Sequence, residues 1–487
     1  MKTVFWISIL AFVSFFGFVA CGGSGGGGNG GGSGPSAAKL TAVNPTVNNS
    51  SVNLGNSIAA TFDKRMNSAS DATFVVYGNK TGKLTGLYTG GRSQTLVFNP
   101  DFAFKTSEVL EVILTGSLKA TDGTSLAPPF VYRFRAEALA GTGVFTAGDE
   151  IVGMTGARGL AAGDWDDDGD SDLAVANFSN SRVAIMKNDG SGGFGVTSSV
   201  GSQSGASALV ALDFDGDGDL DLAVANRGGS TVGLLRNGGN GNFSSAGAVI
   251  GQLDARGLAA GDWDGDGDID LAVANFGGNE VAILENDGTG SFVDVESTIG
   301  LSGATALASG DWDGDGDLDL AVANLSGNSV VVLDNDGDGG FTADSTIGAQ
   351  TGATALAAGD WDGDGDLDLA VVNFTASEVA VLENDGTGLF TDIAAVGSLT
   401  GASAVVTLDW DADGDLDLAV ANKTAGAGEV AILQNDGDGG FTVDSEIEAQ
   451  TGATALAAGD WDGDDALDLA VANSGGDNVK TLENVLF

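Results

Sequence analysis

The feature that most constrains the fold is a segment repeated seven times at a nearly constant spacing. One copy, residues 310–324, reads GDWDGDGDLDLAVAN, in which five aspartates on alternate positions give way to an apolar run. The first aspartate of the copies stands at positions 164, 213, 262, 311, 360, 409 and 460, so the spacing is 49 residues five times and then 51. A period of this length is typical of propeller blades and solenoid repeats.

Each copy contains four short stretches that we interpret as strands. In the fourth copy these are residues 304–312, 318–324, 329–335 and 341–348, separated by turns rich in Asp, Gly and Asn. Four strands per repeat are typical of a propeller blade. The last copy ends before a fourth strand, and residues 143–151 precede the first copy without a blade of their own. We therefore predict an all-β, seven-bladed propeller over 141–487, closed by 143–151 in blade seven, in preference to an open solenoid.

The repeated aspartates are arranged as ligands of a hard cation. In the third copy, Asp262, Asp264, Asp266 and Asp270 occupy positions 1, 3, 5 and 9 of a loop, Gly267 at position 6 allows a sharp turn, and Asp268 at position 7 offers its backbone carbonyl. A flexible loop with many oxygen ligands favours Ca²⁺ over Mg²⁺. Position 12 is valine where an EF-hand has glutamate. A solvated acidic turn is the alternative, but the regular copies favour calcium.

We predict about six strong calcium sites and a doubtful seventh. The predicted metal-binding residues of the six are Asp164, Asp166, Asp168, Asp170 and Asp172; Asp213, Asp215, Asp217, Asp219 and Asp221; Asp262, Asp264, Asp266, Asp268 and Asp270; Asp311, Asp313, Asp315, Asp317 and Asp319; Asp360, Asp362, Asp364, Asp366 and Asp368; and Asp409, Asp411, Asp413, Asp415 and Asp417. The seventh copy offers Asp460, Asp462, Asp464 and Asp468, but Asp465 replaces the glycine, so we expect weak or absent binding there. The aromatic residue at position 2, Trp in six copies and Phe214 in the second, is expected to pack between blades.

The charge of the chain is strongly uneven. Of the net charge of −49, residues 38–140 contribute +3 and residues 141–487 contribute −53. Such an acidic body repels nucleic acid and anionic lipid headgroups and attracts cations, so we expect no nucleic-acid partner. An acidic surface suited to salty surroundings is another reason for the excess, although it does not explain the periodicity. The absence of histidine and the single cysteine exclude the usual zinc sites and internal disulfides.

The N-terminus has the pattern of a secretion signal. Residues 1–20 comprise Met1, Lys2 and an apolar run that ends at Cys21, and no other segment has the composition of a membrane span. Phe18-Val19-Ala20-Cys21 resembles a bacterial lipobox, with phenylalanine where leucine is usual, and the resemblance implies a lipid anchor on Cys21 followed by a Gly/Ser-rich tether, 21–37. Ordinary cleavage after Ala20 is the alternative. Gly22 stands where such lipoproteins often have the aspartate that retains them at the inner membrane, so the resemblance favours the outer membrane of a bacterial cell envelope, facing the periplasm or the surface.

Residues 38–138 form a separate candidate domain. Short alternating runs, among them IAATF (58–62), TLVFNP (95–100) and FVYRFRAE (130–137), are separated by turn residues at spacings typical of a β-sandwich. The succession of FDKRM (62–66), VFNP (97–100), ATDG (120–123) and a terminal YRF (132–134) resembles the bacterial Ig-like domain of S-layer and other surface proteins. That resemblance implies a spacer, and we assign no active chemistry to it.

The repeat itself resembles a known family. WDGDGDLDLAVAN followed by NDGxGxF is similar to the FG-GAP/VCBS repeat, the calcium-binding blade also present in the integrin α-chain propeller, over about 140–487. The resemblance implies calcium-binding β-propeller blades. Members include adhesion proteins and surface proteins of unknown activity, so it implies little about the ligand.

A ligand surface is expected opposite the calcium loops. In a blade, the loops between strands 1–2 and 3–4 share one face, and those between strands 2–3 and 4–1 share the other. Five basic residues map to this second face, Arg158, Arg182, Arg227, Arg256 and Lys423. They form either a positive recess for an acidic ligand, such as a uronate-bearing polysaccharide or a carboxylate of a partner, or they merely offset neighbouring acids.

These observations favour a binding module over an enzyme. We expect a lipid-anchored, calcium-stabilised module of the cell envelope that recognises a polysaccharide or protein ligand, with a monomeric propeller and membrane contact only through the lipid. A structural scaffold or assembly partner is the alternative. No acid/base constellation stands apart from the repeat, so a polysaccharide lyase or hydrolase is less favoured, and no catalytic residue is assigned.

Overall fold

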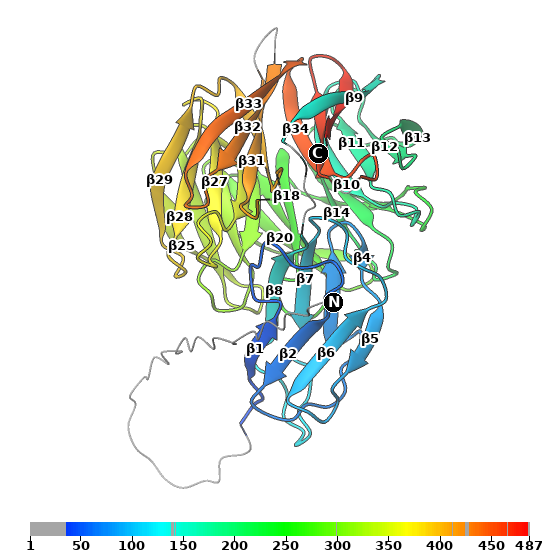
Figure 1. The fold of residues 1–487 in the computed structure, drawn as a ribbon, viewed down its shortest axis with the longest axis vertical. Helices are drawn as coiled ribbons and strands as arrows, with labels where there is room; N and C mark the ends of the chain where they lie inside the picture. The colour runs from blue at the N-terminus through cyan, green and yellow to red at the C-terminus, as the bar shows by residue number, and fades with distance from the viewer. Residues whose placement is uncertain are drawn as a thin grey trace, which may run out of the picture. The chain divides into compact units, whose positions relative to one another are not determined.

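The regular secondary structure of the described residues consists of β-strands (Figure 1). The computed structural model describes residues 36–485 except 138–140, 142, 299, 412, 424–427 and 465. Residues from Ala37 onward belong to one compact unit. No helix in the described part of the chain is long and apolar enough to cross a membrane. Cys21, the predicted signal peptide and the tether up to residue 35 lie outside the described residues.

The first domain is a sandwich of two four-stranded sheets. One sheet has the order β1-β2-β6-β5 and the other β4-β3-β7-β8. The strands are β1 (Leu40–Asn44), β2 (Ile58–Phe62), β3 (Phe74–Gly78), β4 (Gly82–Lys83), β5 (Gly86–Thr89), β6 (Thr95–Pro100), β7 (Val109–Leu114) and β8 (Phe130–Arg135). Alternating apolar residues bury Phe62, Phe74, Phe98, Tyr132 and Phe134 between the sheets. The predicted Ig-like sandwich is therefore confirmed.

The repeats form seven four-stranded antiparallel sheets. Blade one contains β10 (Ala157–Gly163), β11 (Asp172–Asn177), β12 (Arg182–Asn188) and β13 (Phe194–Val200); blade two β14 (Ala206–Leu212), β15 (Asp221–Asn226), β16 (Thr231–Arg236) and β17 (Ser244–Ile250); blade three β18 (Ala255–Gly261), β19 (Asp270–Asn275), β20 (Glu280–Asn286) and β21 (Phe292–Thr298); blade four β22 (Ala304–Gly310), β23 (Asp319–Asn324), β24 (Ser329–Asn335) and β25 (Phe341–Ile347). Blade five contains β26 (Ala353–Gly359), β27 (Asp368–Asn373), β28 (Glu378–Asn384) and β29 (Phe390–Gly397); blade six β30 (Ala402–Leu408), β31 (Asp417–Asn422), β32 (Gly428–Asn435) and β33 (Phe441–Gln450); blade seven begins with β34 (Ala453–Gly459), β35 (Asp468–Asn473) and β36 (Asn478–Asn484).

The two ends of the repeat region meet in the seventh blade. Its fourth strand is β9 (Phe145–Val152), which pairs antiparallel with β36. The first strands of neighbouring blades lie beside one another, and β10 adjoins both β14 and β34. The ring is therefore closed by hydrogen bonds between segments more than 300 residues apart, and the predicted seven-bladed propeller is confirmed.

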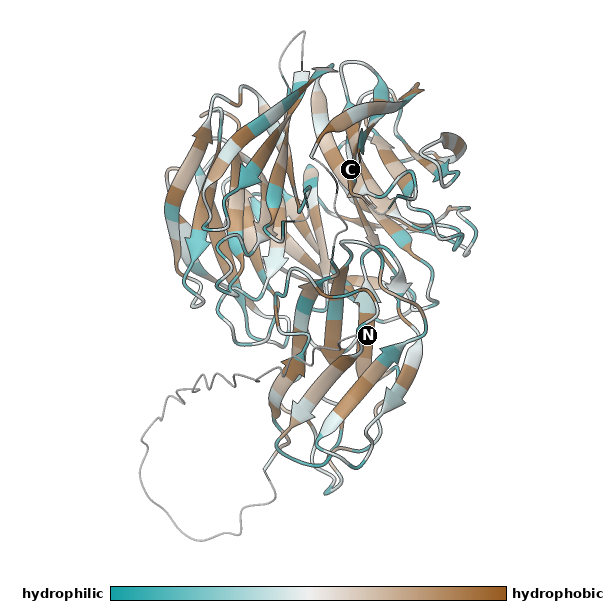
Figure 2. Cartoon of the chain, viewed as in Figure 1, coloured by the Kyte–Doolittle hydropathy of each residue, from teal (hydrophilic) through white to brown (hydrophobic). Residues whose placement is uncertain are grey.

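The second strand of each blade is buried on both faces because neighbouring blades pack against both of its sides. The strand sequence DLAVAN, or DLAVVN in β27, has all six residues buried in each of the seven copies. Small alanines alternate with leucine and valine, so the sheets approach closely. Figure 2 shows apolar colour along the strands of the blades.

Aromatic side chains and asparagines join each blade to the next. Trp312 of blade four is 1% exposed and makes an edge-to-face contact with Phe390 of blade five, with ring centroids 5.8 Å apart. Asn384 Nδ2 of blade five donates to the carbonyl oxygen of Trp312 at 2.9 Å. The same asparagine bond links the other pairs, including Asn188 of blade one to Trp461 of blade seven at 2.8 Å. The position-2 aromatic residues thus pack between blades.

We predict that Trp312→Ala lowers the free energy of unfolding by about 3–5 kcal/mol, because a large cavity opens between blades four and five. Phe102→Ala is the matched control, since this ring is 82% exposed. Urea unfolding followed by circular dichroism measures both variants. Equal losses in the two variants would contradict the packing described here.

Candidate functional site

In blades one to five and seven, the first aspartate of the loop accepts a hydrogen bond from a main-chain NH of the turn that follows it. In blade three, Asp262 Oδ1 accepts a hydrogen bond from the NH of Gly265 at 2.9 Å, and Oδ2 accepts one from the NH of Gly267 at 3.0 Å. Gly267 has φ +103°, which side chains with a Cβ rarely adopt. The glycine at position 6 is therefore required by the turn, as the sequence predicts.

The ninth residue of each loop is a buried aspartate with two main-chain donors. Asp319 is 1% exposed, and its carboxylate accepts hydrogen bonds from the NH of Trp312 at 3.0 Å and the NH of Asn335 at 2.9 Å. Burial raises the pKa of Asp319 to about 8. The equivalent pairs of hydrogen bonds occur in the six other blades. This aspartate thus ties the loop to the end of the third strand.

The carboxylates at positions 1, 3 and 9 converge. Oxygens of Asp164, Asp166 and Asp172 lie within 4.8 Å of one another, as do those of Asp213, Asp215 and Asp221, those of Asp262, Asp264 and Asp270, and those of Asp360, Asp362 and Asp368; in blade four the group is Asp311, Asp313 and Asp315. In blade one, Oδ1 of Asp164 and Oδ1 of Asp166 are buried and accept no hydrogen bond from a described residue. Such orphaned carboxylate oxygens fit a hard cation.

The aspartates at position 7 lie to one side of these clusters. The side chain of Asp268 lies against Gly288 in the loop between strands 3 and 4, and Asp170, Asp219, Asp317, Asp366 and Asp415 lie against the equivalent glycines. In the seventh loop, Gly463 NH donates to Asp460 Oδ1 at 2.8 Å and Ala466 NH donates to Asp464 Oδ1 at 2.9 Å. Asp465 lies outside the described residues.

One side chain beside each loop varies in charge, and the sequence reasoning missed it. Lys187 Nζ contacts Asp166 in blade one, and Arg236 Nε lies 2.6 Å from Asp215 Oδ2 in blade two. At the same position, one residue before the asparagine that ends the third strand, the later blades have Glu285, Asp334, Glu383, Gln434 and Glu483. Blades one and two therefore carry a fixed cation beside the aspartates, where four other blades carry an extra carboxylate.

Side chains of the Ig-like domain contact the aspartate loops. Lys105 Nζ lies 3.3 Å from Asp164 Oδ2, and the NH of Asp262 donates to Glu111 Oε1 at 3.2 Å. Arg133, paired with Glu111, donates to the carbonyl of Ala260 at 2.9 Å. The sequence pattern alone predicted only a spacer. These contacts leave the opposite end of the first strands for a second site.

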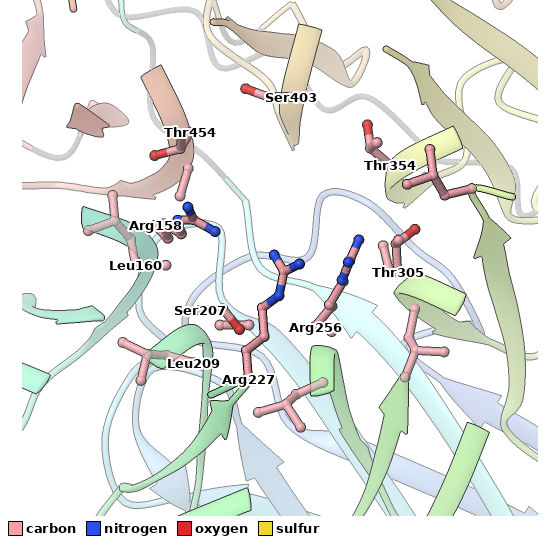
Figure 3. A pocket seen from close by; sticks show the side chains of 18 of the residues that line it. Arg158, Leu160, Ser207, Leu209, Arg227, Arg256, Thr305, Thr354, Ser403 and Thr454 are labelled. Carbon is pink, nitrogen blue, oxygen red and sulfur yellow. The ribbon is translucent and has the colours of Figure 1, made fainter. Parts of the chain in front are cut away.

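That second site is a recess of about 450 Å³, lined at its base by the first strands of all seven blades (Figure 3). The second residue of each first strand lies in a β-bulge, because the pairing skips from the first residue to the third. A bulge re-aims its side chain. The ring of second residues consists of Arg158, Ser207, Arg256, Thr305, Thr354, Ser403 and Thr454.

Four of the five basic residues proposed from the sequence line this recess. They are Arg158, Arg227, Arg256 and Lys423. Arg182 does not line it; its guanidinium lies 3.2 Å from Ser199 Oγ on the outer strand β13. Among the described residues that line the recess there is no Asp or Glu. In a chain with a net charge of −49, this is a local reversal of sign.

The cations of the recess have few partners. Asp254 pairs with both Arg227 and Arg256, while no ion pair of Arg158 or Lys423 occurs among the described residues. Burial, followed by repulsion from Arg227 and Arg256, lowers the pKa of Arg158 below its ordinary value. Burial and the neighbouring Arg158 likewise lower the pKa of Lys423. The recess therefore concentrates uncompensated positive charge.

Family comparisons agree with this architecture. The FG-GAP-like repeat matches residues 164–224, 213–273, 262–322, 311–371, 360–420 and 409–471, and the bacterial Ig-like domain matches 35–136. The chain belongs to the FG-GAP-like repeat family. The repeats together with the Ig-like domain indicate an extracellular binding or recognition module. No curated protein sequence matches the chain.

Two solved structures are similar to this chain at low identity. A structure of BBS1N in complex with ARL6DN has a TM-score of 0.52 and 15% identity, covering 70% of this chain and 98% of that one. A functionally unknown protein from Desulfotomaculum acetoxidans has a TM-score of 0.49 and 13% identity, covering 63% of this chain and 90% of that one. The first likeness supports the propeller fold and no more.

We predict that, in chelator, the free energy of unfolding falls as the pH rises from about 5 to about 8. The folded-state pKa of Asp319, about 8, lies above its ordinary value of 3.8, so its contribution to stability is complete below pH 3.8 and is lost as the pH rises through 8. Asp270 and Asp468 behave alike. Urea unfolding at several pH values measures the slope, and Asp319→Asn is expected to reduce it. A free energy that rises over this range would contradict the assignment.

Proposed function

We propose that this chain is a calcium-stabilised binding module of a bacterial cell envelope that recognises a polysaccharide or protein ligand. The observation that carries the proposal is the division of the propeller into two ends. Carboxylate clusters suited to cations lie at one end of the first strands, and a basic recess with no Asp or Glu among its described lining residues lies at the other. One end serves to hold the blades together, and the other is left to bind.

Calcium is the cation that this donor set favours. The loops offer several carboxylate oxygens each, without histidine or thiolate, which suits a hard cation with six to eight oxygen ligands. Because desolvation raises the pKa of the position-9 aspartates, a bound dication would stabilise their ionised form. Blades three to five are expected to bind more tightly than blades one and two, where Lys187 and Arg236 already supply positive charge.

The N-terminal pattern supports a lipid anchor and a location in the cell envelope. A lipid on Cys21, in the outer membrane, would hold the two domains to the envelope through the Gly/Ser-rich tether. The lipid is then the only membrane contact, and the strong negative charge argues against nucleic acid as a partner.

We further propose that the module is not an enzyme. Glycoside hydrolysis usually needs two carboxyl groups about 5–10 Å apart across the bond that breaks. The described residues that line the recess supply none, which supports a binding role. An envelope scaffold or assembly partner is the competing role, and it would make the recess dispensable.

Calcium is expected to raise the melting temperature of the full-length protein relative to chelator. At calcium tenfold above the dissociation constant, linkage gives about 1.4 kcal/mol per site, or about 8 kcal/mol for the six strong sites. Differential scanning calorimetry with calcium and with chelator measures this. An unchanged melting temperature would reject a structural role for the ion.

The loop of blade one offers a sharper test. Lys187→Glu places a carboxylate where blade three has Glu285, so calcium should bind blade one about tenfold or more tightly. Arg182→Glu makes the same charge change at the opposite end and is the control. Calorimetric calcium titration compares them, and equal curves would contradict the proposed ranking of blades.

Recognition itself is tested on an array of polysaccharides, glycans and matrix proteins. The full-length protein in detergent is applied with calcium and with chelator in parallel. We expect a selective hit that is lost with chelator, because calcium loss loosens the ring that shapes the recess. Silence from a folded protein would support the scaffold role instead.

A further inference from the structure

We infer that the basic recess binds a saccharide whose terminal sugar carries a single carboxylate, as a terminal uronic acid does. This inference rests on the proposed function and names the ligand chemistry and the side chains that hold it. The carboxylate lies among Arg158, Arg227 and Arg256, and the sugar ring lies toward Phe374.

The arginines already hold one carboxylate in the manner required. Asp254 forms two ion pairs. Its Oδ1 pairs with Arg227 Nε, and its Oδ2 lies 3.0 Å from Arg256 Nη2. Planar guanidinium forks match a carboxylate geometrically. Arg158 faces the same space and has no carboxylate partner among the described residues, so a ligand carboxylate completes the set (Figure 3).

Two of the guanidinium groups are fixed before any ligand arrives. Arg158 lies over the ring of Phe178 at 3.8 Å from its centroid, and Arg256 lies over Phe276 at 3.3 Å. In blades one and three, an arginine is the second residue of the first strand and a phenylalanine begins the loop after the second strand. Holding the planar groups in place reduces the entropy lost on binding.

The opposite side of the recess favours a sugar over an acidic peptide. Blade five has a phenylalanine, Phe374, at the same loop position, but the second residue of its first strand is Thr354. Among the described residues no cation stacks on Phe374. Phe374 is 45% exposed, and Leu325 lines the same wall. A pyranose ring has an apolar face beside its carboxylate and can pack on such a wall. An Asp or Glu side chain has no comparable flat face.

The charge around the recess limits the ligand to one acidic group. The third strands begin at the same end of the blades, and Glu280, Glu378 and Glu429 stand at or next to their first residues. A polymer with a carboxylate on every sugar would place the carboxylates outside the recess close to these glutamates. At physiological salt, screening acts over about 8 Å, so neighbouring like charges still repel. A terminal uronate presents its one charge to the recess alone.

The test begins with matched sugars. The full-length protein in detergent and calcium is titrated calorimetrically with glucuronate and galacturonate, with glucose and galactose, with acetate, with polygalacturonate and with glucose 6-phosphate. We expect at least one monomeric uronate to bind, its neutral hexose to bind at least tenfold more weakly, and binding of that uronate to weaken with salt. Polygalacturonate, compared per sugar, is expected to bind more weakly than the monomer.

Variants then locate the site. Arg158→Gln breaks no ion pair of the described residues in the ligand-free protein. It is expected to weaken uronate binding about ten- to a hundredfold. Arg182→Gln removes the same charge from the same end outside the recess and should have little effect. Phe374→Ala should weaken uronate binding while leaving weak acetate binding unchanged. Unchanged melting temperatures show that the variants fold.

Several outcomes overturn the inference. Equal binding of hexose and uronate would show that the carboxylate is not recognised. A preference for glucose 6-phosphate, or for an acidic matrix protein of the array, would point to another class of ligand. Equal affinity of the Arg158 and Arg182 variants would show that the uronate does not bind in the recess. No uronate binding by a folded protein also refutes it. A calcium-dependent hit on the array that does not need Arg158 would refute this inference and leave the proposed function standing.

Discussion

The structure depends on the buried carboxylate at the ninth loop position. Asp319 accepts main-chain hydrogen bonds from Trp312 in its own loop and from Asn335 at the end of the third strand. The amide of Asn335 in turn donates to the carbonyl of Trp263 in the preceding blade. One carboxylate therefore couples the loop, the blade and the ring. A buried charge of this kind is costly unless it is compensated, so the acidic loop and the contacts that close the propeller are parts of one network.

This coupling explains why the two ends of the blades differ so much in sequence variety. At the loop end the copies share the position-9 aspartate and the asparagine, since a change in one of these breaks a contact within the blade or with the neighbouring blade. At the recess end the bulged residue needs only to span two carbonyls, as Thr305 Oγ1 does by lying 3.1 Å from Ala323 O and 3.3 Å from Ala353 O. An arginine can replace it where an aromatic ring supports the side chain. Binding chemistry can therefore vary at the end that does not hold the ring together.

Much of this architecture is predictable from spacing alone. The period of 49 residues, the alternation of the loop and the apolar run place β23 at Asp319–Asn324 within one residue of the predicted strand, and they place β9 beside β36. The basic recess is also predictable in outline, because Arg158 and Arg256 occupy equivalent positions in their repeats. Arg182 lies outside the recess because it begins a third strand and its side chain reaches β13. The charged position that Lys187 and Arg236 occupy was missed because in the sequence it resembles an ordinary exposed end of a strand. Only the fold places these side chains beside Asp166 and Asp215.

The differences between the blades at the recess are what the proposed function depends on. Seven identical blades would present a ligand with seven equivalent orientations, and a ring of threonines and serines would offer no charge. Here the arginines gather in blades one to three, while the exposed aromatic ring belongs to blade five. A ligand with one acidic side and one apolar side therefore has a single preferred orientation in the recess. Because a supporting phenylalanine accompanies Arg158 in blade one and Arg256 in blade three, the asymmetry involves side chains that act together, as the proposed binding site requires.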